Sequence, residues 1–196
     1  MRKLILQVQL TLDGFVAGPE GQLDWMWLSG DIDPAGMEKV IALADSCDTI
    51  LMGRKMTPGF VKYWESVVDN QPGSGEQPLA QRMVNMQKIV FSKTLDTMPG
   101  RNLRVENGDL GTVVQSLKQQ PGKDMIAYGG ATFASALISL GLVDAYYIFL
   151  NPVAIGQGLP IFKETTPLQL ENHTAYKNGK MVLEYLPVRK ELLPAK

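Results

Sequence analysis

The stretch that decides the fold is MIAYGGATFASAL, residues Met125 to Leu137. Its first residues are mostly apolar and run directly into two adjacent glycines, Gly129 and Gly130. Core-type residues then recur at helical spacing from Phe133 onward. A buried strand, a glycine turn and a helix therefore follow one another without a linker. Adjacent glycines at such a junction indicate either a backbone that approaches a ligand at positive φ or close packing of the helix.

The rest of the chain alternates between predicted strands and predicted helices. Strands are expected over residues 4–12, 49–52, 88–91, 103–105, 125–128 and 143–150, and helices after Asp33, from about Pro78 and after Asp109. Asn178-Gly179 lies between two further strand-like stretches and is typical of an antiparallel hairpin. We expect an α/β protein whose mixed sheet carries helices on both faces, built as a single domain over residues 1–196.

The composition fits a globular domain and excludes several kinds of partner. The 196 residues are 45% hydrophobic and 20% charged, with a formal net charge of -1. This balance supplies no broad basic field that would attract nucleic acid or an anionic membrane surface. No apolar run reaches transmembrane length, and the start MRKLILQVQL lacks the features of a signal peptide. We therefore expect a cytoplasmic protein that binds any anionic ligand through a local site.

Cysteine and histidine each occur once, as Cys47 and His173. These counts exclude disulfides within the chain and clustered Cys/His metal sites. A Ser-His or Cys-His nucleophile would have to use His173, which lies in a stretch with the alternation of a late strand. We expect an exposed strand histidine there rather than a catalytic one.

Polar turns follow three of the predicted strands. They are Gly53-Arg54-Lys55, Ser92-Lys93-Thr94 and Gly129-Gly130-Ala131-Thr132. Because right-handed crossovers bring the carboxyl ends of parallel strands to one edge, these turns should lie where α/β sheets bind ligands. The three turns supply glycine backbone, hydroxyl groups, cations and a helix start, which together suit a phosphorylated dinucleotide. The 2′-phosphate of this ligand is expected near Arg54. The alternative is that the glycines only make a tight turn and the charges are solvated.

Five motifs follow one another along the chain: QLTLDGFVAG, TILMGRKM, IVFSKTL, IAYGGATFASALI and FLNPVAIGQGLPIF. In order and spacing they resemble the RibD C-terminal reductase-like family, which shares the dihydrofolate reductase fold. The similarity runs from Met1 to about Tyr185. It implies a three-layer α/β/α domain around a mostly parallel eight-stranded sheet with the C-terminal antiparallel hairpin. It also implies NADPH binding and often a homodimer.

The resemblance assigns roles to the polar turns and to two loops. The cofactor-binding residues it implies are Gly53, Arg54, Lys55, Ser92, Lys93, Gly129, Gly130, Ala131 and Thr132. Ser92 and Lys93 would flank the adenosine 2′-phosphate. The loop Leu12 to Asp24 should cover the nicotinamide. The family pattern G-x-G-x-P-x-F, present over residues 156–162, should shape a loop near the substrate mouth or a dimer contact.

The substrate side departs from true dihydrofolate reductase, which carries an acidic residue at the start of the helix after the nicotinamide loop. The candidates here are Asp24, Asp31 and Asp33, none of them in a matching motif. Because Asp33 is explained as a helix cap, Asp24 is the preferred candidate for substrate contact or protonation.

Hydride transfer asks little of side chains, since the cofactor carries the hydride and the protein holds two rings in contact and excludes water. Phe15, Trp25 and Trp27 are candidates for an aromatic wall against a flat heterocycle, with core packing as the alternative for at least one of them. Asp13 is expected to fix the loop through an Asx-turn.

We expect an NADPH-dependent reductase of a small nitrogen heterocycle, similar to 5-amino-6-(5-phosphoribosylamino)uracil reductase of riboflavin biosynthesis. The alternatives are a dihydrofolate or pterin reductase and a non-catalytic nucleotide-binding or assembly module on the same fold. A phosphoribosyl substrate would need further basic side chains, for which Arg82, Lys88 and Lys163 are candidates. The strand AYYIFL, residues 145–150, could join a homodimer surface, although a core strand is the favoured interpretation.

Overall fold

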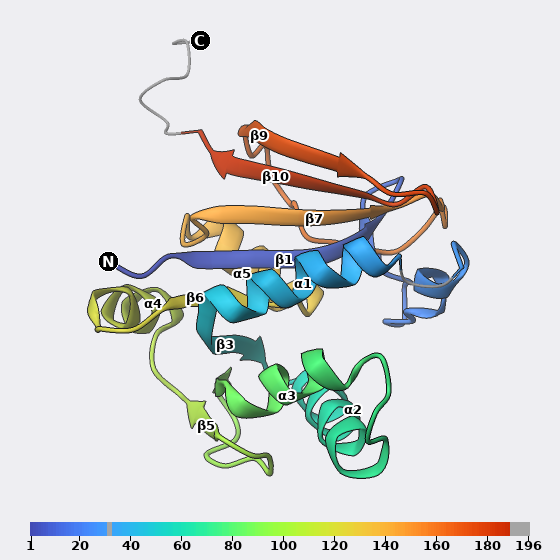
Figure 1. Ribbon diagram of the computed structural model, residues 1–196. Coiled ribbons are helices and arrows are strands. Elements are labelled where there is room, and N and C mark those ends of the chain that lie inside the picture. The colour runs from blue at the N-terminus through green and yellow to red at the C-terminus, as the bar shows by residue number, and fades with distance from the viewer. Residues whose placement is uncertain (31–32, 189–196) are drawn as a thin grey trace, which may run out of the picture.

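The computed structural model describes residues 1–30 and 33–188 and contains one large mixed sheet (Figure 1). In this part of the chain its eight strands follow the order β5-β4-β3-β6-β1-β7-β10-β9. The strands are β1 Leu4–Thr11, β3 Cys47–Gly53, β4 Gln87–Phe91, β5 Leu103–Glu106, β6 Asp124–Ala127, β7 Ala145–Asn151, β9 Leu168–Ala175 and β10 Met181–Pro187. All pairs from β5 to β7 are parallel, and β10 is antiparallel to both of its neighbours. The predicted mostly parallel sheet with a C-terminal antiparallel hairpin is confirmed.

Helices cover both faces of this sheet, as the three-layer prediction requires. They are α1 Pro34–Ser46, α2 Thr57–Asn70, α3 Gln77–Asn85, α4 Leu110–Gln119 and α5 Ala131–Ser139, and a 3-10 helix, η1, spans Asp24–Trp27. Side chains of α1, α2 and α3 pack in one hydrophobic cluster, whereas α4 and α5 contribute to the other. In Figure 1, α1 crosses in front of the sheet and α5 lies behind it.

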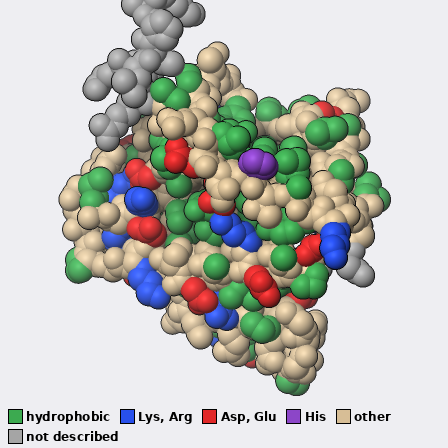
Figure 2. All heavy atoms as spheres, turned by 45° about the horizontal axis from the view of Figure 1, so that its top comes forward, with side chains coloured by type: hydrophobic (Ala, Val, Ile, Leu, Met, Phe, Trp, Pro, Cys, Tyr) green, Lys and Arg blue, Asp and Glu red, His purple; other side chains and the backbone are tan. Residues whose placement is uncertain are grey.

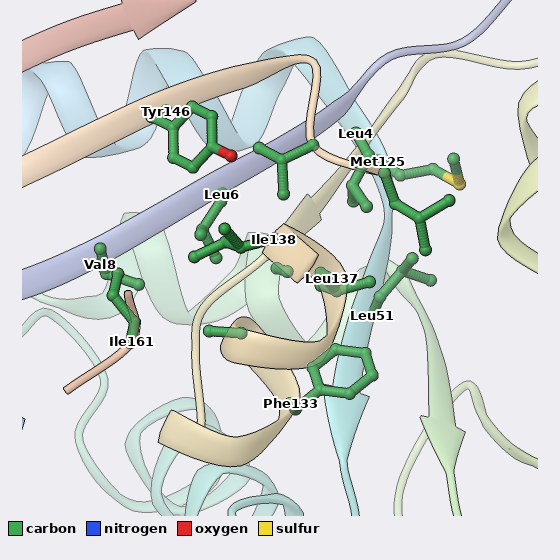
Figure 3. Packing of buried hydrophobic residues seen from close by; sticks show 14 of the residues in the cluster. Leu4, Leu6, Val8, Leu51, Met125, Phe133, Leu137, Ile138, Tyr146 and Ile161 are labelled. Atoms are coloured by element: carbon green, nitrogen blue, oxygen red, sulfur yellow. The ribbon is translucent and has the colours of Figure 1, made fainter. Parts of the chain in front are cut away.

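The central position of β1 explains why its first residues are all apolar and do not alternate with polar ones. Leu4 and Leu6 lie in the cluster formed with α5, and Ile5 lies in the cluster formed with α1. Because helices cover both faces, successive side chains of a central strand are buried on opposite sides. Figure 3 shows Phe133 and Leu137 of α5 among the side chains of the first cluster.

Two helix starts that the sequence predicts are confirmed by their capping bonds. The carboxylate of Asp33 accepts a hydrogen bond from the N–H of Ala35 over 3.0 Å at the start of α1. The carboxylate of Asp109 accepts one from the N–H of Thr112 over 2.9 Å at the start of α4. Each cap satisfies a backbone donor that has no partner within the helix.

One helix and one short strand pair were not expected from the sequence. Residues 57–70 form α2, with Pro58 in the first turn, where a missing N–H is harmless. Residues 71–76 form the turn between α2 and α3. The loop predicted over residues 12–24 contains a short strand, β2, Phe15–Ala17. It pairs with β8, Leu159–Pro160, and such distant pairing is not encoded in local propensity.

The C-terminal hairpin is confirmed, but its turn is longer than a two-residue Asn-Gly turn. The N–H of Tyr176 donates to the carbonyl of Lys180 over 2.8 Å, and the N–H of Gly179 donates to the carbonyl of Tyr176 over 3.0 Å. Gly179 has a φ of 81°, whereas Asn178 does not share a positive φ. This is the pattern of a three-residue loop with glycine in the left-handed position.

Two further predictions about strands are confirmed. β7 lies between β1 and β10, and Tyr146 and Ile148 are buried, so AYYIFL is a core strand. His173 is exposed on β9. Among the described residues, no helix has both the length and the apolar character needed to cross a bilayer.

Candidate cofactor and substrate site

The three polar turns meet at the carboxyl edge of the sheet. β3 lies between β4 and β6, and Gly53 is in register with Phe91 at the end of β4. The N–H of Arg54 donates to the carbonyl of Phe91 over 3.3 Å and so ties the first turn to the second strand end. The strand ends that precede Arg54, Ser92 and Gly129 are therefore neighbours, as the topology argument predicts.

The glycine turn has an unusual backbone. Gly129 and Gly130 have φ values of 110° and 80°, which residues with a Cβ rarely adopt. Gly130 is the N-cap residue of α5, and no side chain caps this helix. The first N–H groups of α5 and the positive end of its dipole are thus left for a ligand or solvent at the carboxyl edge. An anion such as a diphosphate fits this arrangement.

The two explanations for glycine in these turns apply to different positions. A Cβ on Gly53 would lie 2.9 Å from the Cβ of Phe133, so Gly53 allows α5 to pack closely on the end of β3. A Cβ on Gly130 would lie 3.7 Å from the Cβ of Met56, which is ordinary contact. Gly130 is therefore required by its backbone conformation rather than by lack of space.

The cations of the turns differ in their surroundings. Arg54 and Lys55 are exposed and form no ion pair with another described residue. The Nζ atom of Lys93 donates to the carbonyls of Asn107 and Gly108 over 2.9 and 2.8 Å, so this side chain braces the turn before α4. Arg54 and Lys55 are thus available to an anion, whereas Lys93 is already engaged.

Ser92 also takes part in its own turn. Its Oγ atom accepts hydrogen bonds from the N–H groups of Thr94 and Leu95 over 3.1 and 2.9 Å. Ser92 is buried, and its hydroxyl proton is still available as a donor. Together the three turns offer backbone N–H groups, hydroxyls, a guanidinium and ammonium groups, and contain no carboxylate. This donor set suits phosphate oxygens.

The loop after β1 is tied to the G-x-G-x-P-x-F segment. The carboxylate of Asp13 accepts hydrogen bonds from the N–H groups of Ile155 and Gly156 over 3.1 and 2.7 Å. The hydroxyl of Thr11 and these N–H groups lower the pKa of Asp13. A Cβ on Gly158 would lie 2.4 Å from the carbonyl oxygen of Ala17, so the two segments touch. The N–H of Phe15, which an Asx-turn at Asp13 would use, instead donates to the hydroxyl of Thr11 over 2.9 Å. The predicted Asx-turn is therefore wrong, and Asp13 fixes the loop to a distant segment.

The predicted substrate residues lie in and around η1 and β2. Asp24 is exposed at the first position of η1, and Phe15 is half-buried in β2. Trp25 is only 3% exposed and Trp27 is 60% exposed, so core packing accounts for Trp25. The Nζ atom of Lys180 donates to the carbonyl of Met26 over 3.3 Å, which places η1 beside the β9–β10 turn. Asp31 lies outside the described residues.

Two buried polar side chains at this end of the sheet were missed at the level of sequence. The Oε1 atom of Gln7 and the hydroxyl of Tyr128 are buried and have no hydrogen-bond partner in the protein. The signal was present, because Gln7 interrupts the apolar run LILQVQL and Tyr128 stands directly before Gly129. A polar residue in a strand that is buried on both faces calls for an explanation.

Two of the three candidate phosphoribosyl contacts are used elsewhere. Arg82 pairs with Asp45 over 2.6 Å, and Lys88 is buried with its Nζ atom donating to three carbonyls at the end of α3. Lys163 remains exposed. The prediction that Arg82 and Lys88 contact the substrate is therefore wrong. In the fold, Arg82 of α3 pairs with Asp45 of α1, and Lys88 bonds the carbonyls at the end of α3.

Two hollows on the surface lie away from the three turns. One of about 400 Å³ is lined by residues including Asn85 and Arg104, and another of about 260 Å³ by residues including Asp48 and Lys123. Both lie toward the amino ends of the parallel strands, opposite the candidate site. Within residues 1–30 and 33–188, no three His, Cys, Asp or Glu side chains are grouped as a metal site would require.

The sheet order and its two helical layers define a dihydrofolate reductase-like fold of the RibD reductase type. A putative riboflavin biosynthesis protein from Shewanella sp. PV-4 has this fold, with a TM-score of 0.73, 18% identity and alignment over 95% of this chain and 99% of that one. A diaminohydroxyphosphoribosylaminopyrimidine deaminase/5-amino-6-(5-phosphoribosylamino)uracil reductase from Thermotoga maritima gives a TM-score of 0.63 at 16% identity, over 95% of this chain and 57% of that one. At these identities the likeness establishes the fold.

The chain belongs to the RibD C-terminal domain family, which it matches over residues 2–182. The protein "Uncharacterized protein YyaP" of Bacillus subtilis (strain 168) is 32% identical over 187 residues, which cover 94% of each chain. The resemblance carried by the five motifs is thereby confirmed.

Proposed function

We propose that this protein is an NADPH-dependent reductase of a small nitrogen heterocycle, of the type represented by 5-amino-6-(5-phosphoribosylamino)uracil reductase. Membership of the RibD C-terminal domain family supports this proposal. The observation that carries it is the meeting of three carboxylate-free turns at the carboxyl edge, with Gly129 and Gly130 at positive φ before an uncapped helix. Such an edge is where α/β sheets bind phosphorylated ligands.

The residues of the turns would divide the work of holding the cofactor. The first N–H groups of α5, at Ala131 and Thr132, would bind the diphosphate, and Arg54 and Lys55 would neutralise phosphate charge. Ser92 would donate its hydroxyl proton to the 2′-phosphate, with Lys93 beside it. NADPH would supply the hydride. The chain itself would hold the two rings in contact, and the loop from Leu12 to Asp24 would exclude water.

Asp24 is the proposed substrate contact and proton source. It is exposed at the start of η1, next to the buried ring of Trp25, and η1 is held against the β9–β10 turn. Phe15 would border the heterocycle. A pterin or dihydrofolate reductase and a nucleotide-binding module without turnover remain the competing functions. Assay of NADPH oxidation with pyrimidine, pterin and dihydrofolate substrates distinguishes these three functions.

Cofactor titration tests the proposal. Arg54→Ala should weaken NADPH binding by about 1.5–3 kcal/mol and leave NADH binding nearly unchanged, because only NADPH carries the 2′-phosphate that a charge-assisted bond would hold. Arg101→Ala is the control. Arg101 is exposed, lies away from the three turns, and forms an ion pair with Asp69 over 2.6 Å. Equal loss for both cofactors would remove Arg54 from the 2′-phosphate site. Failure of both to bind wild-type protein at low-millimolar concentration would refute the reductase assignment.

We also propose a homodimer. β9 forms an edge of the sheet and is exposed along most of its length, with Leu170 48% exposed. Figure 2 shows hydrophobic side chains around His173 on this face. Light scattering should give a mass twice the 21.6 kDa of one chain, and a mass of one chain at micromolar concentration would contradict the dimer.

A further inference from the structure

Unpaired buried polar atoms indicate where a ligand could supply hydrogen bonds that the protein does not. Among the described residues these atoms belong to Gln7, Trp25, Ser29, Ser74, Tyr128 and Asn151. A buried polar group without a partner loses the hydrogen bonds that water would give it, so natural cores rarely keep one. Two of these side chains are neighbours at the proposed site and make no other hydrogen bond.

Gln7 and Tyr128 lie next to each other on one face of the sheet. Ile5 is in register with Ile126 and Leu6 with Ala127, so Gln7 and Tyr128 occupy the next position on adjacent strands. Neighbouring strands lie about 4.8 Å apart, and side chains alternate between faces. Gln7 therefore shares the face of Ile5 and Ile126, where Tyr128 also packs.

The surroundings place this pair beside the cofactor turn. Tyr128 directly precedes Gly129, and the ring of Phe60 stacks on it with centroids 5.8 Å apart. Met56 packs in the same cluster and approaches Gly130. Phe60 is a half-buried side chain in the first turn of α2, so the pair lies between this helix and the cofactor turn.

Asn151, whose Oδ1 atom is also unpaired, has a structural role through its amide nitrogen. The amide nitrogen of Asn151 donates to the side chain of Gln9 over 2.9 Å and to the carbonyls of Leu10 and Phe149 over 3.2 and 3.1 Å. Asn151 therefore holds the ends of β1 and β7 together. Gln7 and Tyr128 have no comparable role, because neither side chain makes a recorded bond in the described structure.

We propose that Gln7 and Tyr128 form the specificity pair that recognises the NH–C=O edge of a ureide ring, such as a uracil. This inference rests on the proposed function and names the residues that select its substrate. The Oε1 atom of Gln7 accepts the ring N–H, and the hydroxyl of Tyr128 donates to the adjacent ring carbonyl. A site with such buried polar groups rejects analogues that cannot satisfy them.

The hydroxyl of Tyr128 stays protonated at physiological pH. Burial raises its pKa far above the ordinary value for tyrosine, because the phenolate would be poorly solvated there. Tyr128 is therefore a hydrogen-bond donor rather than a base. Its contribution is to bind and orient the ring, and proton transfer is left to another group.

Calorimetry with 5,6-diaminouracil and its 1,3-dimethyl derivative tests this pair, since methylation removes both ring N–H donors. Wild-type protein should bind the first compound and bind the second at least about tenfold more weakly. Tyr128→Phe and Gln7→Leu should each weaken binding of 5,6-diaminouracil at least about fivefold, with NADPH affinity unchanged. Tyr63→Phe is the control, because the hydroxyl of Tyr63 is exposed and bonds Glu76 over 2.8 Å.

Stability supplies an independent measurement that does not depend on any ligand. Removing an unpaired buried hydroxyl should leave the urea midpoint of Tyr128→Phe unchanged or raise it. A lowered midpoint would show that the hydroxyl has a structural partner and would overturn the inference. So would ligand affinities of both variants within twofold of wild type, or no preference for 5,6-diaminouracil over its dimethyl derivative.

The ureide titrations are run with and without NADPH. This design distinguishes failure of the reductase proposal from failure of the proposed specificity pair. Selective ureide binding without any NADPH binding would refute the reductase and retain the pair. NADPH binding without any binding of 5,6-diaminouracil at millimolar concentration would retain the reductase and overturn the pair.

Discussion

Replacing Gly130 by alanine tests the backbone on which the cofactor turn depends. Gly130 has φ 80° and ψ 106°, a combination that lies outside even the left-handed helical region open to other residues. The new Cβ would lie 3.7 Å from the Cβ of Met56 and 3.9 Å from that of Phe133, so collision contributes little. Backbone strain alone should lower the free energy of unfolding by about 1–3 kcal/mol.

The matched control is Gly59→Ala. Gly59 lies in α2, its φ is not positive, and a Cβ there would meet nothing within 4 Å. Alanine should therefore stabilise the protein by about 0.4–1 kcal/mol, because it restricts the unfolded chain and favours the helix. The same chemical change thus has opposite signs at two positions.

Urea unfolding followed by tryptophan fluorescence and circular dichroism measures both effects. For a slope near about 2 kcal/mol per molar, Gly130→Ala should lower the midpoint by about 0.5–1.5 M with the slope unchanged. Gly59→Ala should raise it slightly. If Gly130→Ala unfolds at the wild-type midpoint, or if both variants lose the same stability, the argument from backbone conformation is wrong.

Two further predictions concern groups that hold the fold together. Asp109→Ala should lower the free energy of unfolding by about 1 kcal/mol, since it removes the cap that accepts from the N–H and the hydroxyl of Thr112, and an unchanged urea midpoint would contradict this. Burial lowers the pKa of Lys88 from 10.5 to about 8. Between these values the unfolded chain binds more protons than the folded protein, so the free energy of unfolding should rise with pH by up to about 3 kcal/mol. Lys88→Met should lack this rise, and an identical pH profile in wild type and variant would refute the assignment.

The order and type of most elements could be predicted from the sequence because the signals are local. Asp33 and Asp109 cap helices through bonds to residues two or three positions away. Gly129 and Gly130 take positive φ in a turn whose flanking strand and helix are read directly from periodicity. α2 is not among the predicted helices, although its apolar residues recur at helical spacing.

The role of individual polar side chains was decided by tertiary structure. Lys88 was a candidate substrate contact by charge alone, and the fold turns its ammonium onto three carbonyls at the end of α3. Asp13 finds its partners at Ile155 and Gly156, far along the chain. A polar residue's hydrogen bonds depend on which distant backbone groups the strand order brings beside it.

The sequence by itself determined the alternation of strands and helices, the glycine turn and the polar strand ends, because each follows from spacing and local conformational preference. Only the tertiary structure decided that Gln7 and Tyr128 stand side by side without partners in the protein. Sequence patterns show that a residue is polar and lies in a buried strand. Whether its hydrogen bonds are satisfied depends on the packing of strands that are distant in the chain.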